Sequence, residues 1–254
     1  MNKPYRLAPE QLSRLIPELG YGFVTDKVTV DGQAVDYMVR QEPENDDDSG
    51  WVFYGGGETQ AYLDNPDNTS VLSLNTVANY DPAIIPFLTY PPGTEIERQP
   101  DGRLQVVSGH TERPQVILQP PVGPGWVDIA GRWTFDSSEL LLRRLDGNSL
   151  VLWRPGLTFW ISLYGASTAD CEGRMAALLA QTSPMKTDLE QRVADRHCQA
   201  AYRLQEEVDG KSQCGTYLFG FAEGGDIHLA IYQDDDTHQA SVRRVWDTLR
   251  YQGA

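Results

Sequence analysis

Basic residues are scarce in this sequence. Its 254 residues include 21 lysines and arginines against 36 aspartates and glutamates, which gives a formal net charge of −15 at pH 7. Proteins that bind nucleic acid neutralise phosphates with lysine and arginine, and anionic membrane surfaces attract basic segments. The composition therefore argues against a nucleic-acid partner and against a membrane partner, and it favours a protein partner with a basic surface.

Long apolar runs and paired cysteine motifs are also missing. The first residues, MNKPYRLAPEQ, lack the apolar run of a signal peptide, and no stretch of about 18 apolar residues suggests a membrane span. The three cysteines, Cys171, Cys198 and Cys214, form no CxxC motif. An odd number of cysteines without a secretory signal indicates reduced thiols, so we expect a cytoplasmic protein. The sequence leaves open whether the chain forms a homodimer.

Signatures of metal binding and nucleophilic catalysis are absent as well. No two of the four histidines are three or four residues apart, and there is no HExxH or GxSxG motif. Asp64 and Asp67 lie in a segment without the ligand spacing of an EF-hand. We therefore expect no metal and no other cofactor.

The composition is that of a folded protein, with 40% hydrophobic and 10% aromatic residues. At roughly 150 residues per domain, the length fits one large domain or two small ones. Four prolines between Arg113 and Gly125 predict a stiff, extended connection over residues 113–125. We accordingly expect one domain over residues 1–112 and a second over residues 126–254.

Apolar periodicity and turn signals predict the elements of the first domain. We expect a helix over Leu7–Leu19, a hairpin turn at Asp31-Gly32, and a short helix that begins at Pro82 after an Asp81 cap. A second hairpin is expected around Asp101-Gly102. The expected strands are Tyr21–Val30, Val35–Arg40, Trp51–Tyr54, Thr94–Arg98 and Arg103–Val107.

The second domain shows the same mixture of elements. Expected helices are Ala169–Gln181, Asp188–Glu207 and Thr237–Tyr251. Expected strands are Leu140–Leu145, Ser149–Arg154, Thr158–Tyr164, Gly215–Ala222 and Ile227–Gln233. The predicted fold class is α+β, with two domains that are each a mainly antiparallel sheet with helices packed on it.

Negative charge is concentrated in the first domain. Residues 1–100 hold 16 acidic and 6 basic side chains, and the loop from Gln41 to Gly50 alone holds Glu42, Glu44, Asp46, Asp47 and Asp48. Five acids in ten residues repel one another, and a cationic partner would offset that repulsion. The simplest alternative interpretation is a solvated loop.

Several short segments of the first domain follow one another in a recognisable order. They are Val24–Val28, Tyr37–Pro43, Asp48–Phe53, Asp64–Asn68, Leu74–Thr76, Asn79–Pro82 and Ile85-Pro86. Over residues 23–98 these segments resemble a bacterial immunity-protein domain that is common beside genes for polymorphic toxins. No family is recognised for residues 114–254.

The resemblance implies an inhibitor rather than an enzyme. Such proteins bind a toxin, often a nuclease delivered by contact-dependent or type VI secretion systems, and block its active site or assembly. The residues that we expect at the toxin contact are Glu42, Glu44, Asp46, Asp47, Asp48, Glu58, Asp64, Asp67, Tyr54 and Tyr62. Trp51, although near the acidic loop, is expected in the core.

Two other hypotheses remain open at this point. The acidic residues between positions 42 and 67 would suit a hydrolase or another metal-dependent enzyme, since folding can bring two carboxylates together. Alternatively, the chain is an adaptor or scaffold that acts through its C-terminal domain.

Overall fold

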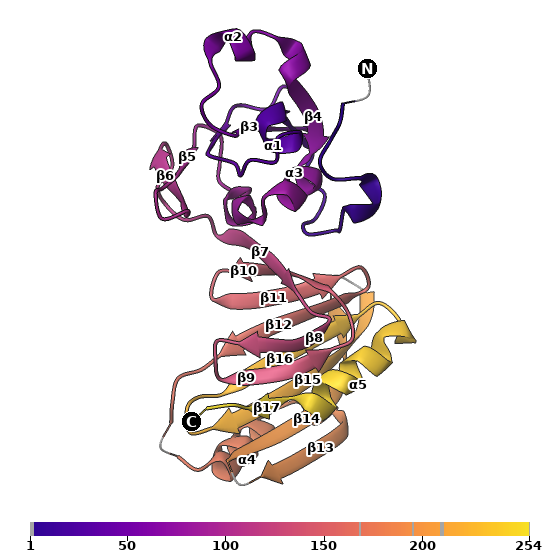
Figure 1. Ribbon diagram of the computed structural model, residues 1–254. Coiled ribbons are helices and arrows are strands. Elements are labelled where there is room, and N and C mark those ends of the chain that lie inside the picture. The colour runs from indigo at the N-terminus through magenta and orange to yellow at the C-terminus, as the bar shows by residue number, and fades with distance from the viewer. Residues whose placement is uncertain (1–2, 168, 195, 209–210, 254) are drawn as a thin grey trace. The chain divides into compact units, whose positions relative to one another are not determined.

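A computed structural model describes residues 3–167, 169–194, 196–208 and 211–253 (Figure 1). The chain forms two compact units, Met1–Pro120 and Pro121–Ala254. The division lies in the proline-rich stretch 113–125, of which Val116–Val122 form strand β7.

The first unit is built on a six-stranded sheet in the order β4-β1-β3-β2-β5-β6. The strands β1 and β3 run parallel, and the other neighbours are antiparallel. The expected antiparallel sheet is therefore confirmed, with one parallel pair inside it. The strands are β1 (Tyr21–Thr25), β2 (Tyr37–Arg40), β3 (Asp48–Tyr54), β4 (Thr69–Ser73), β5 (Glu95–Arg98) and β6 (Leu104–Ser108).

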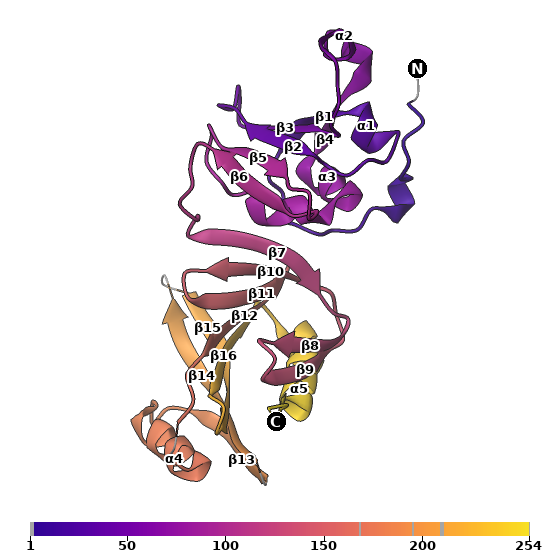
Figure 2. The ribbon, with the colours of Figure 1, turned by 60° about the vertical axis from the view of Figure 1, so that its left-hand side comes forward.

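Short helices cover one face of this sheet (Figure 2). They are α1 (Asp26–Thr29) and α3 (Leu74–Tyr80), with the 3-10 turns η1 (Pro9–Gln11) and η3 (Pro82–Phe87). The short helix α2 (Gln60–Leu63) and the turn η2 (Pro66–Asn68) follow β3 and lie beyond the end of the sheet. Trp51 and Phe53 are fully buried on the covered face, as expected for Trp51. Gly22 lies above them, and a Cβ at this position would come within 2.6 Å of the carbonyl oxygen of Trp51.

The helix expected over Leu7–Leu19 is wrong apart from η1. The amide groups of this segment are bound by asparagines on α3 instead of by a helix of its own. Asn75 accepts from Leu15 and Ile16, and Asn79 accepts from Ser13.

The two expected hairpins have different outcomes. The one around Asp101-Gly102 is confirmed, because β5 and β6 pair on either side of it. The one at Asp31-Gly32 is wrong, because the chain turns into α1 after Thr25 and β3 lies between β1 and β2. The expected cap is confirmed: Asp81 accepts a hydrogen bond from the amide of Ala83 at the start of η3.

The second unit is built on an eight-stranded sheet in the order β13-β14-β15-β16-β12-β11-β10-β7 and a three-stranded sheet in the order β17-β9-β8. The neighbours from β13 to β10 are antiparallel, as are those of the three-stranded sheet. The strands after β7 are β8 (Gly125–Ile129), β9 (Trp133–Ser137), β10 (Leu141–Asp146), β11 (Ser149–Arg154), β12 (Leu157–Leu163), β13 (Thr187–Ala194), β14 (His197–Val208), β15 (Lys211–Ala222), β16 (Ile227–Gln233) and β17 (Arg250–Tyr251). One large core cluster, which includes Trp133, Phe135 and Trp246, packs between the two sheets and the last helix.

Helices are fewer in this unit than expected. Two are confirmed in shortened form, α4 (Cys171–Gln181) and α5 (Gln239–Thr248), the latter preceded by the 3-10 turn η4 (Asp236–His238). The helix expected over Asp188–Glu207 is wrong, because its described residues form β13 and most of β14. No helix in the described part of the chain is long and apolar enough to cross a membrane.

The expectation of three reduced thiols is also corrected. Cys171, the first residue of α4, forms a disulfide with Cys198 of β14, and their Cα atoms are 5.6 Å apart. Cys214 is free. The two bonded positions are 27 residues apart in the sequence, so spacing alone did not suggest the pair.

Candidate functional site

The acidic loop between β2 and β3 is fastened to the neighbouring strand β1. The amide of Tyr21 donates to the carbonyl oxygen of Asp47 at 2.9 Å, and the hydroxyl of Ser49 donates to the carbonyl oxygen of Tyr21 at 2.6 Å. The two bonds involve Asp47 and Ser49, which flank Asp48 at the start of β3. The loop therefore has a defined position beside β1.

Asp48 shapes the loop from within. Its carboxylate accepts hydrogen bonds from the amide of Glu44 at 2.9 Å and from the amide of Gly50 at 2.8 Å. These two bonds lower the pKa of Asp48, since they stabilise its charged form. One of the expected contact residues is thus largely engaged in holding the loop together.

The other four acids of the loop, Glu42, Glu44, Asp46 and Asp47, are exposed. They do not all lie on the same surface. Glu44, Asp47 and Asp48 line a hollow of about 200 Å³ together with Tyr21, Phe23 and Val71, whereas Glu42 and Asp46 do not line it. The acidic loop therefore has one part that lines the hollow beside β1 (Glu44, Asp47 and Asp48) and one part that lies outside it (Glu42 and Asp46).

Three apolar residues of this hollow were not predicted from the sequence. Tyr21, Phe23 and Val71 have exposed fractions of 48%, 47% and 57%. Phe23 on β1 lies opposite Val71 on the edge strand β4. Alternation in the first four residues of β1, where Tyr21 and Phe23 are exposed and Gly22 and Val24 are buried, is the signal that would have indicated Tyr21 and Phe23.

The same face continues across the sheet. Phe23 pairs with Val52 on β3, which pairs with Val39 on β2, which pairs with Glu95 on β5. Glu95 accepts a hydrogen bond from the hydroxyl of Tyr37 at 2.9 Å. Burial, and then this bond to a carboxylate, raise the pKa of Tyr37 to about 12. The face is thus apolar in its middle, with acidic groups on two sides.

The remaining expected acids lie at the other end of β3. Glu58 accepts from the hydroxyl of Thr25 at 2.7 Å and from the amide of Gly55 at 2.8 Å, so it closes the turn after β3. Asp64 accepts from the side chain of Gln60, and Asp67 is exposed in η2. A seven-residue strand spans roughly 20 Å, and α2 projects beyond the end of the sheet (Figure 2). The two groups of acids therefore do not converge on one point.

The two tyrosines expected at the contact are also separated from the loop. Tyr54 packs against Tyr37 with ring centroids 5.6 Å apart, and Tyr62 lies under the Lys27 ammonium at 5.9 Å from the ring centroid. Burial raises the pKa of both hydroxyls. Both tyrosines are partly buried and belong to the region around the end of β3.

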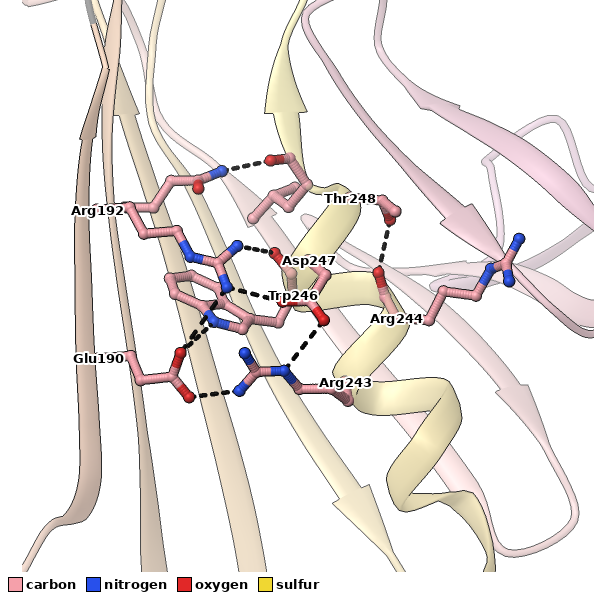
Figure 3. Close-up of polar contacts among 9 residues, drawn as sticks. Glu190, Arg192, Arg243, Arg244, Trp246, Asp247 and Thr248 are labelled. Carbon is pink, nitrogen blue, oxygen red and sulfur yellow. Dashed lines mark hydrogen bonds and ion pairs between the residues drawn. The ribbon is translucent and has the colours of Figure 1, made fainter.

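The second unit carries a charged network between β13 and α5 (Figure 3). Glu190 accepts from the Trp246 indole at 2.9 Å and from Arg243 at 2.5 Å, while Arg192 donates to Asp247 at 2.7 Å. These hydrogen bonds lower the pKa of Glu190 and of Asp247. Carboxylates that are paired in this way are poor proton donors near neutral pH, and the network serves to fasten α5 to the edge of the sheet.

The acidic residues of the first unit do not form a catalytic or metal-binding arrangement in the described part of the chain. In the described ranges, no three histidine, cysteine, aspartate or glutamate side chains come together as metal ligands. The carboxylates between residues 42 and 67 lie at opposite ends of β3. The geometry therefore gives no support to a hydrolase that uses these acids.

Comparison with known protein families matches residues 22–108 to the Immunity protein Imm33 domain. This confirms the resemblance to a bacterial immunity-protein domain that the sequence segments indicate. The matched residues contain nearly all of strands β1–β6 and the whole acidic loop. No curated protein and no solved structure matches the chain.

Proposed function

We propose that this chain is an immunity protein that binds a bacterial toxin and blocks its active site or its assembly. The observation that carries the proposal is the match of residues 22–108 to an immunity protein domain. An inhibitor of this kind acts by forming a complex and needs no catalytic group of its own. The lack of convergence among the acids of residues 42–67 supports inhibition over hydrolysis.

The proposed partner is a toxin with a basic surface, and a nuclease fits best. Nucleases hold phosphates with basic residues, and an acidic protein occupies such a surface as a mimic of the substrate. The first 100 residues, with 16 acidic and 6 basic side chains, provide the complementary charge. Delivery of the toxin by a contact-dependent or type VI secretion system is part of the same proposal.

The experiment is co-expression with the toxin encoded beside the gene for this chain. We expect growth of the toxin-expressing cells to be restored and the two proteins to co-purify in a stoichiometric complex. The proposal is overturned if the chain neither restores growth nor co-purifies with the toxin. A chain ending at residue 113 tests the adaptor hypothesis, because it keeps β1–β6 and should still protect.

A nuclease that acts in the cytoplasm needs its inhibitor there, so we propose a cytoplasmic location. In that compartment cellular reductants would keep Cys171 and Cys198, which are bonded to each other in the structure, in the dithiol form. Cells quenched with acid and treated with an alkylating reagent should yield protein modified at Cys171, Cys198 and Cys214. Modification at Cys214 alone would place the protein in an oxidising compartment, with the Cys171–Cys198 disulfide formed.

A further inference from the structure

The hollow beside β1 combines two kinds of wall. Phe23 and Val71, neighbours on adjacent strands, form an exposed apolar wall together with Tyr21. Glu44, Asp47 and Asp48 form the acidic wall. A surface of this kind suits a side chain that is apolar along its stem and positively charged at its tip, which describes arginine and lysine.

We propose that this hollow receives one basic side chain of the toxin, with its stem against Phe23 and Val71 and its charged group against Glu44 and Asp47. The inference rests on the proposed function and names the contact that this function would use. Arginine fits better than lysine, because its planar group also packs on aromatic rings such as that of Tyr21 and forms paired bonds to carboxylates.

The charges of the hollow are available for such a contact. Within the part of the chain that the structure describes, neither Glu44 nor Asp47 has an ion-pair partner for its side chain. Asp48, in contrast, already accepts two backbone hydrogen bonds. The acidic wall therefore keeps two carboxylates that a partner's cation can neutralise.

The shape of the hollow exists before any partner binds. The bonds from Tyr21 to Asp47 and from Ser49 to Tyr21 fix the loop against β1, and Asp48 fixes the turn. A contact that is ordered in advance loses little conformational entropy on binding. This favours the hollow over the part of the loop outside it, Glu42 and Asp46, as the place where affinity arises.

The negative charge of the hollow favours a basic protein partner over a second copy of this chain. A second copy of the chain would bring its own acidic loop and an excess of ten negative charges over residues 1–100 against the same surface. Like charges in an interface are strongly unfavourable. A basic protein partner is the occupant that this surface favours.

Two pairs of variants with equal changes of charge test the inference. Glu44→Gln with Asp47→Asn removes two charges from the hollow, and Glu42→Gln with Asp46→Asn removes two charges from the same loop outside it. Affinity for the toxin encoded beside the gene is measured by calorimetry with an inactivated toxin. We expect the first pair to weaken binding roughly 30-fold or more and the second by less than about threefold.

A second comparison tests the apolar wall. Val71 and Val107 are exposed valines on the two edge strands of the same sheet, with exposed fractions of 57% and 44%. Val71→Arg would place a guanidinium of the chain itself beside the acids, so we expect at least tenfold weaker binding. Val107→Arg should change the affinity by less than about threefold, and thermal melting of both variants shows that they fold.

The outcomes separate the two proposals. If the unmodified protein fails to bind this toxin, the proposed function falls and the inference with it. If the unmodified protein binds but each variant of the hollow behaves like its control, the inference alone is overturned. Equal and large losses in both charge pairs also overturn it, because they would indicate general attraction rather than one seated side chain.

Discussion

Asp81 illustrates how much one buried carboxylate does in the first unit. It is only 8% exposed, accepts hydrogen bonds from the amides of Val35 and Ala83, and pairs with Arg98 at 2.5 Å. Arg98 in turn donates to the carbonyl oxygen of Val35. The pair thus joins the start of η3, the segment before β2 and the end of β5.

Replacement of Asp81 should be severe for this reason. We expect Asp81→Ala to lower the free energy of unfolding by about 3–5 kcal/mol, because it leaves the largely buried Arg98 without its ion-pair partner and the buried amide of Val35 without its acceptor. Asp101→Ala, which removes an exposed partner of Arg103, should change it by about 1 kcal/mol or less. Urea denaturation measures both, and equal losses would contradict the assignment.

His228 gives the second unit a stability that depends on pH. Its ring lies 4.8 Å from that of Phe219 and 4.5 Å from that of Tyr164, and burial lowers its pKa from 6.5 to about 4. Between these values the unfolded chain binds more protons than the folded chain, so stability rises with pH. The stabilisation is complete above about pH 6.5 and is lost as the pH falls towards about 4.

A variant that lacks the His228 imidazole should have a stability that depends less on pH. We expect the free energy of unfolding of His228→Gln to vary less between about pH 6.5 and about pH 4 than that of the unmodified protein. Thermal melts at a series of pH values measure the difference. His110→Gln, which alters an exposed loop residue, should leave the original dependence unchanged.

At the scale of elements, α4 depends on a covalent link to the sheet. The disulfide between Cys171 and Cys198 joins its first residue to β14, beside a small cluster of buried residues that includes Met175 and Phe219. A disulfide that closes a loop of 27 residues lowers the conformational entropy of the unfolded chain. In the chain-entropy account this raises the free energy of the unfolded state by about 3.5 kcal/mol.

Reduction should therefore destabilise the oxidised protein by a few kcal/mol. We expect dithiothreitol to shift the urea midpoint of the oxidised protein downwards, and to leave that of Cys171→Ser with Cys198→Ala unchanged. Circular dichroism during the titration follows both. An equal response of the two proteins to the reductant would show that the bond contributes nothing.

Sequence patterns predicted the strands better than the helices, for physical reasons. The described residues of Asp188–Glu207 carry apolar residues at helical spacing, yet β14 buries Cys198, Ala200, Ala201 and Tyr202 on both of its faces, so the alternation that marks a strand is lost. Likewise, Leu7–Leu19 has the spacing of a helix, but its amides are bound by Asn75 and Asn79 far along the chain. Neither contact is visible in local sequence.

The candidate site was predictable in part. A run of acids such as Asp46–Asp48 indicates a charged loop without knowledge of the fold, and the loop is there. Which acids face Phe23 and Val71 depends on the placement of β3 between β1 and β2, a long-range pairing. For the same reason, nearness in the sequence placed Asp64 and Asp67 at the same expected contact as the acidic loop, although strand β3 separates the loop from these two aspartates.

At the scale of the whole molecule, the net charge of −15 should govern how fast the partner is found. Complementary charge speeds association, and salt screens this attraction. We expect the association rate with the proposed toxin to fall at least about tenfold between low and high salt, and the dissociation rate to change less. Stopped-flow mixing over a salt series measures both, and a rate independent of salt would contradict the electrostatic role.

The pleat of β1 has an evolutionary consequence. Gly22 and Val24 face the core, where a change is costly, whereas Tyr21 and Phe23 point outwards and contribute little to the packing beneath. The side chains of Tyr21, Glu44 and Asp47 are likewise not needed to hold the loop, which is fixed by the backbone bond from Tyr21 to Asp47 and by the side chains of Asp48 and Ser49. If this face is the proposed recognition surface, mutations can change it while the scaffold stays folded, and a lineage that meets a new toxin can alter its specificity one side chain at a time.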